Sequence, residues 1–567
     1  MFINDVYPLK AQFMKGEEII IRIELKNTLD MDVRTGIIMK VCFLDEVKEV
    51  IEFDTREVKA GESIAFDVEL KPKYENFMGY GVDVYLIRNG MQIDEFSGSF
   101  DVVSDWRKTP RYGFLADFYS DDMDDAKDIE ALRKLHINMV QFYDWMYRGD
   151  MLVSSSEEYT DMMGRKVNSK VVMQKVSYCH DFGMHALAYG AVYSACREFY
   201  EKHRDWGLYD ANSEVLKFID RFYIMNISQE CPWHDHIIEQ YKQAVEIMGF
   251  DGIHMDTYGF PKKAVSIHGN ERKIEYLDEH FPILIENTRK TLSATKEDVC
   301  LIFNNVGNWP VVSVADTCVD AIYIEVWKPY ERYCHLQQII MNAQTLGKGK
   351  AVILAAYLKP FENESNEEIQ KAETAALLLT AVVYSHGAYS LLWGEEKGVL
   401  TQGYYVDYAE ISGSFFRIIR NYHDFIIRYS NLFFDSSLKN VSMTHADGDN
   451  KEYIFENLDY STYGEAGKVW VVIRENKKYK VISLINFSGC TDDYWNKGKN
   501  PPCMVDSFKI KVQAVENIKS FFTASPDQEF GRPEKPVCYI ENNENGKYFV
   551  FDKIRLNTWS ILVICME

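Results

Sequence analysis

Two short apolar segments of the chain each end in a carboxylate. GIHMD ends at Asp256, and AIYIE ends at Glu325. Hydrolysis of a glycosidic bond needs two carboxyl groups on either side of that bond. In a retaining enzyme they lie about 5–5.5 Å apart. We therefore predict that Asp256 attacks the anomeric carbon and that Glu325 protonates the leaving oxygen and then activates water.

Other predicted strand ends carry side chains that bind sugars. Aromatic rings stack on sugar rings, whereas acids and amides bind hydroxyl groups. Most candidates follow an apolar segment, and Asn226 lies in the long connection WGLYDANSEVLKFIDRFYIMNISQECPWHDH. The candidate substrate-binding residues are Asp117, Tyr143, Asp144, Trp145, Tyr189, Asn226, His254, Tyr258, Asn304, Asn305, Trp309, Trp327, Trp393 and Glu395.

Each candidate also has a purely structural alternative. Asp144 could bind a sugar hydroxyl or form an ion pair with Arg148. His254 lies two residues before Asp256 and therefore points to the same side of a strand. It could orient Asp256 or be a hydrogen-bonded core histidine. Aromatic residues make up 14% of the chain, which fits a carbohydrate site but equally fits a large core rich in β-structure.

The elements that must position these residues alternate between strand and helix from about residue 105. The strand patterns are YGFLADF (112–118), NMVQFYD (138–144), HALAYG (185–190), GIHMD (252–256), CLIFN (300–304), AIYIE (321–325), AVILAA (351–356) and AYSLLW (388–393). Helical patterns such as HIIEQYKQAVEIMG separate them. Eight such units predict a (β/α)8 barrel, in which functional residues lie at the carboxyl ends of the strands.

The two flanking regions have a strand pattern. Apolar and polar residues alternate in EEIIIRIELKN, RTGIIMKVCFL, ESIAFDVELK and GYGVDVYLIRNG near the start, and in KVWVVIRENKKYKVISLINFS, SFKIKVQA and WSILVICME near the end. We predict a multidomain protein with an immunoglobulin-like β-sandwich at 1–104, a catalytic TIM barrel at 105–432 and a second β-sandwich at 433–567.

Composition excludes some classes of function. With 63 Lys and Arg against 86 Asp and Glu, the formal charge is −23, so nucleic acid is not an expected partner. The 11 cysteines form no zinc-like spacing, and we expect neither metal nor cofactor. No apolar run is long enough to span a membrane. No secretion signal is visible, so we expect a cytoplasmic protein, or a secreted one if a signal has been removed. The oligomeric state stays open.

Seven segments, which follow one another along the chain, carry a similarity that goes beyond single residues. They are VQFYDWMYR (140–148), GMHALAYGAVYSA (183–195), WGLYDANS (206–213), GFDGIHMDTYG (249–259), YIEVW (323–327), AVILAAYLKP (351–360) and LLWGEEKGVLTQGYY (391–405). In these segments the chain resembles glycoside hydrolase family 66, which comprises bacterial dextranases and cycloisomaltooligosaccharide glucanotransferases. The run YSLLWGEEKG is less polar than this resemblance leads us to expect.

The resemblance implies a retaining attack on α-1,6-linked glucan, with Asp256 in the nucleophile position and Glu325 in the acid/base position. It also implies an immunoglobulin-like N-terminal domain and a Greek-key C-terminal domain. The glucanotransferases of the family carry a large carbohydrate-binding insertion in the barrel, for which this chain has no room. We therefore expect an endo-acting dextranase, acting on dextran or isomaltooligosaccharides.

Other functions stay open. A related transferase and an exo-acting isomaltooligosaccharide hydrolase would use the same carboxylates. A glucan-binding protein without activity, or a structural or adhesive protein, would need neither carboxylate.

Overall fold

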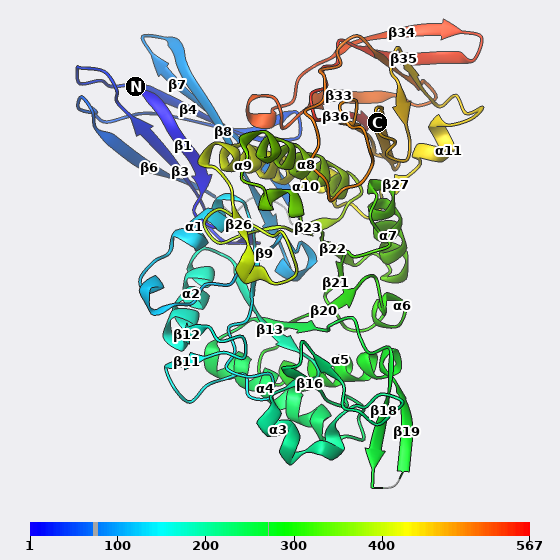
Figure 1. Cartoon of the computed structure of the whole chain (residues 1–567). Coiled ribbons are helices and arrows are strands. Elements are labelled where there is room, and N and C mark those ends of the chain that lie inside the picture. Colours follow the sequence, from blue (N-terminus) through cyan, green and yellow to red (C-terminus); the bar gives the residue numbers. More distant parts are fainter. Residues whose placement is uncertain (72–76, 270) are drawn as a thin grey trace.

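The computed structural model describes residues 1–71, 77–269 and 271–567. Its centre is a curled 11-stranded sheet (Figure 1), and eight of its strands pair in parallel in chain order. These eight are the strands predicted from sequence. They are β9 (Tyr112–Leu115), β10 (Met139–Phe142), β13 (His185–Ala191), β17 (Gly252–Asp256), β20 (Cys300–Val306), β21 (Ala321–Glu325), β22 (Ala351–Ala355) and β23 (Tyr389–Leu391).

The last of these strands leads directly back toward the first. β24 (Trp393–Gly394) follows β23, and Gly394 pairs in parallel with Phe114 of β9. A Cβ atom at Gly394 would collide with the ring and the carbonyl oxygen of Phe114. Glycine at this position therefore allows the two ends of the curled sheet to approach each other. β25 (Gly398–Val399) and β26 (Ala409–Glu410) extend the sheet beyond this point in antiparallel pairs.

Helices separate the successive parallel strands. Local signals fix their ends: Asn168 accepts a hydrogen bond from the backbone of Lys170 at the start of α2, and Gly249 ends α4 with φ 83°. The separating helices are α1 (Lys127–Lys134), α2 (Ser169–Asp181), α4 (Pro232–Met248), α5 (Leu277–Ser293), α6 (Val311–Val314), α7 (Tyr333–Leu346) and α8 (Asn366–Ser385).

The N-terminal region consists of two sheets around a core of their own. In β3 the inward positions Ile19, Ile21, Ile23 and Leu25 are buried and alternate with more exposed ones, as the sequence pattern predicts. One sheet holds β1 (Phe2–Pro8), β3 (Ile19–Lys26) and β6 (Ser63–Leu70). The other holds β2 (Phe13–Met14), β8 (Met91–Val103), β7 (Met78–Arg88), β4 (Gly36–Phe43) and β5 (Glu46–Asp54).

The C-terminal region also has two sheets and a core between them. The larger holds β27 (Lys439–Asn440), β29 (Tyr460–Ser461), β30 (Val469–Glu475), β31 (Tyr479–Asn486), β36 (Trp559–Met566) and β33 (Ile518–Ala524). The smaller holds β28 (Tyr453–Glu456), β32 (Lys509–Gln513), β35 (Gly546–Asp552) and β34 (Val537–Asn543).

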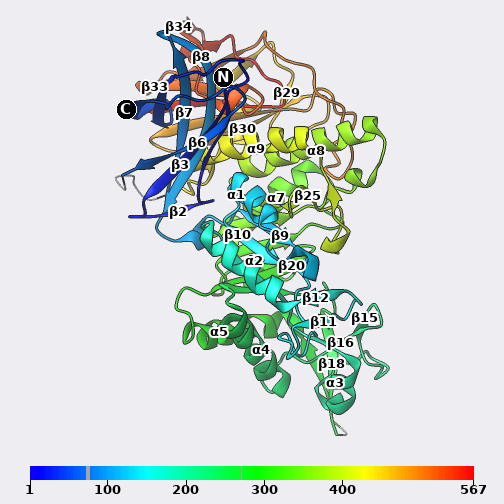
Figure 2. The same ribbon diagram turned by 90° about the vertical axis from the view of Figure 1, so that its left-hand side faces the viewer.

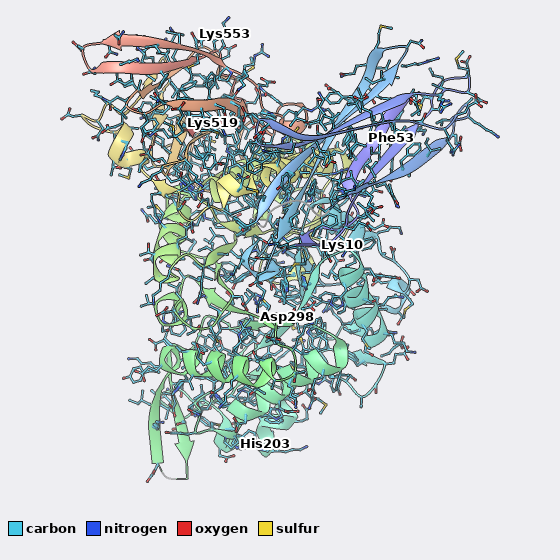
Figure 3. The ribbon with its side chains drawn as sticks, turned by 180° about the vertical axis from the view of Figure 1, so that it is seen from behind. Lys10, Phe53, His203, Asp298, Lys519 and Lys553 are labelled. Carbon is cyan, nitrogen blue, oxygen red and sulfur yellow. The ribbon has the colours of Figure 1, made fainter. Side chains whose placement is uncertain are left out.

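The two β regions lie at one end of the molecule, and the connection between β13 and α4 lies at the other (Figures 1 and 2). Figure 3 shows the same separation from behind, with His203 of that connection far from Lys519 and Lys553. None of the described helices is both long and apolar enough to cross a membrane.

A buried ion pair joins the N-terminal region to α9 (Gly413–Arg428). Arg428 donates to both carboxylate oxygens of Asp83 on β7, at 2.8 and 3.0 Å. Burial would raise the pKa of Asp83, but the charges of Arg428 and Arg532 outweigh it and hold that pKa well below its usual range. The carboxylate is therefore ionised at neutral pH and compensates the buried guanidinium.

We expect Asp83→Ala to lower the free energy of unfolding by about 3–5 kcal/mol, because it leaves Arg428 buried without its carboxylate partner. Thermal unfolding monitored by circular dichroism measures the change. Asp67→Ala is the control, since its pair with Arg22 is more than a third exposed and contributes about 1 kcal/mol or less. Equal losses in the two variants would contradict a special role for the buried pair.

Candidate active site

A cavity of about 520 Å³ opens at the carboxyl ends of the parallel strands. Asp256 is the last residue of β17, and Glu325 is the last residue of β21. Both side chains line the cavity and both residues are nearly buried, at 8% and 9% exposed. The fold therefore brings together two carboxylates that are 69 positions apart in the sequence.

Asn304, on β20 between these two strands, contacts both carboxylates. Its Nδ2 donates to Oδ1 of Asp256 at 2.7 Å and to Oε2 of Glu325 at 3.1 Å. These two carboxylate oxygens are therefore no farther apart than the sum of the two distances. That sum is less than about 6.5 Å, which is the shortest separation of the two carboxyl groups in inverting enzymes.

Two tyrosines hold the remaining carboxylate oxygens. Tyr189 on β13 donates to Oδ2 of Asp256 at 2.7 Å. Tyr357, two residues beyond β22, donates to Oε1 of Glu325 at 2.8 Å. The Tyr357 hydroxyl also lies 3.1 Å from that of Tyr405, which lies 3.0 Å from that of Tyr323. Both carboxylates are thus fixed in orientation by neutral donors, and among the described residues no cationic side chain is hydrogen-bonded to either.

Burial raises the pKa of both carboxyl groups. The pKa of Asp256 rises to about 7, first because of burial and second because of the nearby Glu325 charge, while hydrogen bonds from Asn304 and Tyr189 oppose the rise. Burial likewise raises the pKa of Glu325, against the hydrogen bonds from Asn304 and Tyr357. Because two charges at this separation repel each other, the pair readily retains one proton. One acid beside one carboxylate is the state that acid–nucleophile chemistry needs.

His254 lies below the carboxylates on the same side of β17. Its Nδ1 is 2.9 Å from the Tyr112 hydroxyl, and burial lowers its pKa to about 3, so the ring is neutral. The side chain lines the cavity. No hydrogen bond joins it to Asp256 within the described part of the chain, so its contacts are those of a hydrogen-bonded histidine in the cavity floor.

Asp144 provides a third carboxylate in the cavity wall. It has a φ of 50°, and burial raises its pKa to about 7. The alternative of an ion pair with Arg148 is wrong, because Arg148 donates to the carbonyl oxygens of Tyr147 and Thr160. Arg165 is the cation whose charge opposes the rise.

The structure brings most of the predicted residues to one place. Besides the two carboxylates of the pair, the predicted residues that line the cavity are Tyr143, Asp144, Tyr189, His254, Tyr258, Asn304 and Trp327. Trp327 is 43% exposed, so part of its side chain is open to a ligand.

Seven predicted substrate contacts need correction, because their side chains do not line this cavity. Trp145 is fully buried and donates to the Tyr189 carbonyl oxygen, and Asn305 is fully buried and donates to the Tyr323 carbonyl oxygen. Asn226 is buried, and its Oδ1 accepts a hydrogen bond from the backbone N–H of Ser228. These three side chains point into the protein and stabilise the wall.

The side chains of the other four residues are also engaged in contacts within the protein. The ring of Trp309 is covered by Lys262, whose Nζ lies 3.7 Å from the ring centroid. Trp393 is buried against Phe415. Glu395 accepts from the backbone of Asp117 at 3.1 Å, and the Asp117 carboxylate accepts from Tyr408. Glu395 and Asp117 therefore join the two ends of the curled sheet.

Sequence reasoning missed about half of the cavity wall. Tyr357 directly follows the predicted strand AVILAA (351–356), so its position is a usable signal. Gln141 and Val306 lie on strands and Thr257 directly follows one, whereas most of the others come from connections whose path the sequence pattern does not define. The missed lining residues are Gln141, Met146, Met163, Phe218, Ile219, Phe222, Thr257, Val306, Tyr357, Gly403, Tyr404 and Tyr405. Among the described residues, no three His, Cys, Asp or Glu side chains are grouped so as to hold a metal ion.

Comparisons with known proteins identify a family over nearly the whole chain. The model of glycosyl hydrolase family 66 matches residues 8–563. A cycloisomaltooligosaccharide glucanotransferase of Niallia circulans is 22% identical over 710 residues, which cover 99% of this chain and 71% of that protein. A dextranase of Streptococcus salivarius is 21% identical over 574 residues, covering 86% of this chain and 68% of that protein.

A solved structure shares the fold over nearly the whole length. It is a Paenibacillus cycloisomaltooligosaccharide glucanotransferase complexed with cycloisomaltoheptaose. The TM-score is 0.90 with 19% sequence identity, and the match covers 99% of both chains.

Proposed function

Because the chain belongs to glycosyl hydrolase family 66, we propose that it cleaves α-1,6-glucosidic linkages in dextran or isomaltooligosaccharides by double displacement. Asp256 is the nucleophile and Glu325 the general acid and base. The observation that carries the proposal is the bridge from Asn304 to both carboxylates. It favours the separation of a retaining pair over the wider separation of an inverting pair.

In the first step Asp256 attacks the anomeric carbon while Glu325 gives its proton to the departing glycosidic oxygen. A glycosyl ester on Asp256 results. In the second step Glu325, now ionised, takes a proton from water, and the oxygen of that water displaces Asp256. This cycle requires that Glu325 holds a proton and that Asp256 is ionised when the substrate binds.

Two buried amide oxygens support a sugar ligand. Gln141 Oε1 and Asn304 Oδ1 have no hydrogen-bond partner in the described structure, and both residues line the cavity. Buried acceptors normally have donors, and sugar hydroxyls would supply them. The partly exposed indole of Trp327 offers a surface on which a glucosyl ring can stack.

We also infer that the curled sheet is a closed (β/α)8 barrel, on the basis of the pairing of Gly394 with Phe114. The flanking sheets then form an immunoglobulin-like sandwich at 1–104 and a Greek-key sandwich at 433–567. This arrangement leaves 105–432 as the catalytic domain.

Transfer is a second candidate activity at the same site. Curated relatives that cover 99% of the chain are glucanotransferases, so an isomaltooligosaccharide acceptor could replace water in the second step. Exo-acting hydrolysis of isomaltooligosaccharides would use the same two carboxylates. A glucan-binding role without catalysis would leave the ordered carboxylate pair without a purpose.

Incubation of the purified protein with dextran tests the proposal, with products separated by chromatography and with starch and cellulose as controls. We expect a spread of isomaltooligosaccharides from dextran alone. A single small product would indicate exo action, and non-reducing rings would indicate cyclisation. Absence of action on dextran and on isomaltooligosaccharides would contradict the proposed function.

The pH profile should respond to Tyr357. Its hydroxyl donates to ionised Glu325 and thereby lowers the pKa of that carboxyl group. Tyr357→Phe removes the donor, so the pKa of Glu325 rises and the acid form survives to higher pH. We expect the alkaline limb of kcat/KM to move to higher pH. Tyr408→Phe, which loses a hydrogen bond to Asp117 outside the cavity, should leave that limb in place. A shift to lower pH in Tyr357→Phe would contradict the assignment.

A further inference from the structure

A short β-hairpin from the connection after β13 reaches the catalytic cavity. Its strands are β15 (Lys217–Phe218) and β16 (Phe222–Ile224), and Phe218 pairs with Phe222 across a three-residue turn. Arg221, in this turn, donates to the carbonyl oxygen of Met162. The tip of the hairpin is therefore held against a segment about sixty positions earlier, next to the cavity-lining Met163.

The turn has an unfavourable residue at its first position. Ile219 has a φ of 44° and Asp220 a φ of 55°. Asp tolerates this left-handed region, whereas a β-branched residue there is a steric outlier. Gly or Asn is the usual choice in such turns. Local backbone preference therefore does not account for isoleucine at this position.

Packing in the core does not account for it either. Ile219 is 51% exposed, yet it lines the cavity. An exposed apolar side chain with strained backbone at the edge of an active site points to a functional constraint. The available partner for this side chain is whatever enters the cavity.

Ile219 belongs to a continuous apolar wall. The ring of Phe218 stacks on that of Tyr258, with centroids 4.3 Å apart and planes at 16°, and Phe222 lies 5.9 Å from Tyr258. Tyr258 is two residues beyond Asp256. We call Phe218, Ile219, Phe222 and Tyr258 the lip. The two carboxylates are nearly buried and Ile219 is half exposed, so the lip extends from beside the nucleophile to the mouth.

We propose that the lip is an acceptor site: it holds a second glucosyl unit at the mouth of the cavity, so that the glycosyl-enzyme is resolved by a sugar hydroxyl in preference to water. This inference rests on the proposed function and extends it by naming the residues that set the balance between transfer and hydrolysis. Ile219 is the specificity-determining residue.

The chemistry of the two outcomes differs only in the attacking oxygen. An acceptor hydroxyl forms a bond to the anomeric carbon, the bond from that carbon to Asp256 breaks, and its electron pair returns to the carboxylate. The hydroxyl proton passes to Glu325. In hydrolysis the oxygen of a water molecule forms the bond to the anomeric carbon, and the water proton passes to Glu325. No other reactant is needed, so the outcome depends on which oxygen occupies the position above the ester.

An apolar lip favours the sugar for a physical reason. The faces of a glucosyl ring carry C–H groups that pack on aromatic and aliphatic side chains, and this contact removes apolar surface from water. Water gains nothing from such a surface. A bound acceptor also displaces water from the mouth, so the competing nucleophile is depleted where the ester forms.

The test compares Ile219→Gly with Asp220→Gly, with isomaltohexaose as the substrate. Each hydrolysis creates one new reducing end, whereas each transfer creates none, so bonds cleaved and reducing ends gained together give the ratio of transfer to hydrolysis. We expect this ratio to fall about tenfold in Ile219→Gly, within the range that the loss of small apolar contacts produces. This variant should unfold at no lower temperature than the wild type, since glycine adopts this φ without steric cost.

Asp220→Gly is the matched control, because it introduces the same glycine into the same turn but leaves the lip intact. The Asp220 side chain is 91% exposed, so we expect a wild-type ratio. An unchanged ratio in Ile219→Gly, or equal falls in both variants, would overturn the inference. Wild-type protein that only hydrolyses would also overturn it while leaving the roles of Asp256 and Glu325 in place. Failure to cleave isomaltohexaose or dextran at all would instead count against the proposed function.

Discussion

Asp256→Ala is expected to slow the release of reducing ends from dextran by about 10⁴- to 10⁶-fold, the range lost when other covalent enzymes lose a member of their nucleophilic unit. The reason is that no other carboxylate of the cavity is held by Asn304 and Tyr189 at the end of β17. Asp298→Ala is the matched control. Asp298, labelled in Figure 3, lies in the segment that precedes β20; its side chain is exposed, and its loss should leave the rate unchanged.

Azide distinguishes a lost nucleophile from a damaged fold. In Asp256→Ala the space left by the carboxylate admits a small anion, which attacks the anomeric carbon in a single displacement. We expect azide to restore activity and to give a β-glucosyl azide, the inverted product. Retained activity without azide, or an α-glucosyl azide, would show that Asp256 is not the nucleophile.

Glu325→Gln is expected to lower the rate on dextran by about 10²- to 10⁴-fold, the contribution of a positioned acid and base. Glutamine keeps the shape of the side chain, and its single amide oxygen can still accept from Asn304 or from Tyr357, but it carries no transferable proton. Glu297→Gln, at an exposed position just before β20, is the control and should behave as the wild type.

The acid role of Glu325 makes a further distinction possible. A substrate whose leaving group needs no protonation, such as a nitrophenyl α-isomaltoside, should form the glycosyl-enzyme almost normally in Glu325→Ala. Its hydrolysis should then be slow, so a burst of nitrophenol precedes a low steady rate. Azide should accelerate the second step and give the α-configured azide. An equal defect on dextran and on the activated substrate would contradict an acid/base role.

The central sheet could be predicted from sequence because each parallel strand is a short apolar run with helical residues after it. GIHMD and AIYIE match β17 and β21 residue for residue. The apolar residues of such a strand are buried within the sheet. The charged residue at the end of the strand can therefore face an opening only at the carboxyl end of the sheet. The positions of Asp256 and Glu325 in one cavity follow from this rule.

The direction in which an individual side chain points was harder to predict from sequence than the position of its strand. Asn304 and Asn305 are adjacent, but side chains alternate along a strand, so Asn304 reaches both carboxylates while Asn305 turns toward the Tyr323 carbonyl oxygen. Trp309 is a suitable sugar platform by residue type, and the side chain of Lys262 covers it. Both outcomes depend on neighbours that are distant in the sequence or on the other face of a strand.

Connections without periodic patterns supply much of the rest of the cavity wall, and the sequence does not define their paths. Tyr405 lies more than ten residues beyond β23, yet its hydroxyl lies 3.1 Å from that of Tyr357. Ile219 lies at the tip of a hairpin whose turn residues break the usual preference for Gly or Asn. Sequence patterns indicate regular elements, and these two residues are placed by tertiary contacts of irregular segments.

The anomeric configuration of the first product tests the account most directly. Proton NMR of dextran during the first minutes of cleavage resolves new α and β reducing ends before mutarotation mixes them. Double displacement through Asp256 predicts that the α anomer appears first and that the β anomer follows at the rate of mutarotation. Initial appearance of the β anomer would mean a single displacement, and it would contradict the assignment of Asp256 as a covalent nucleophile.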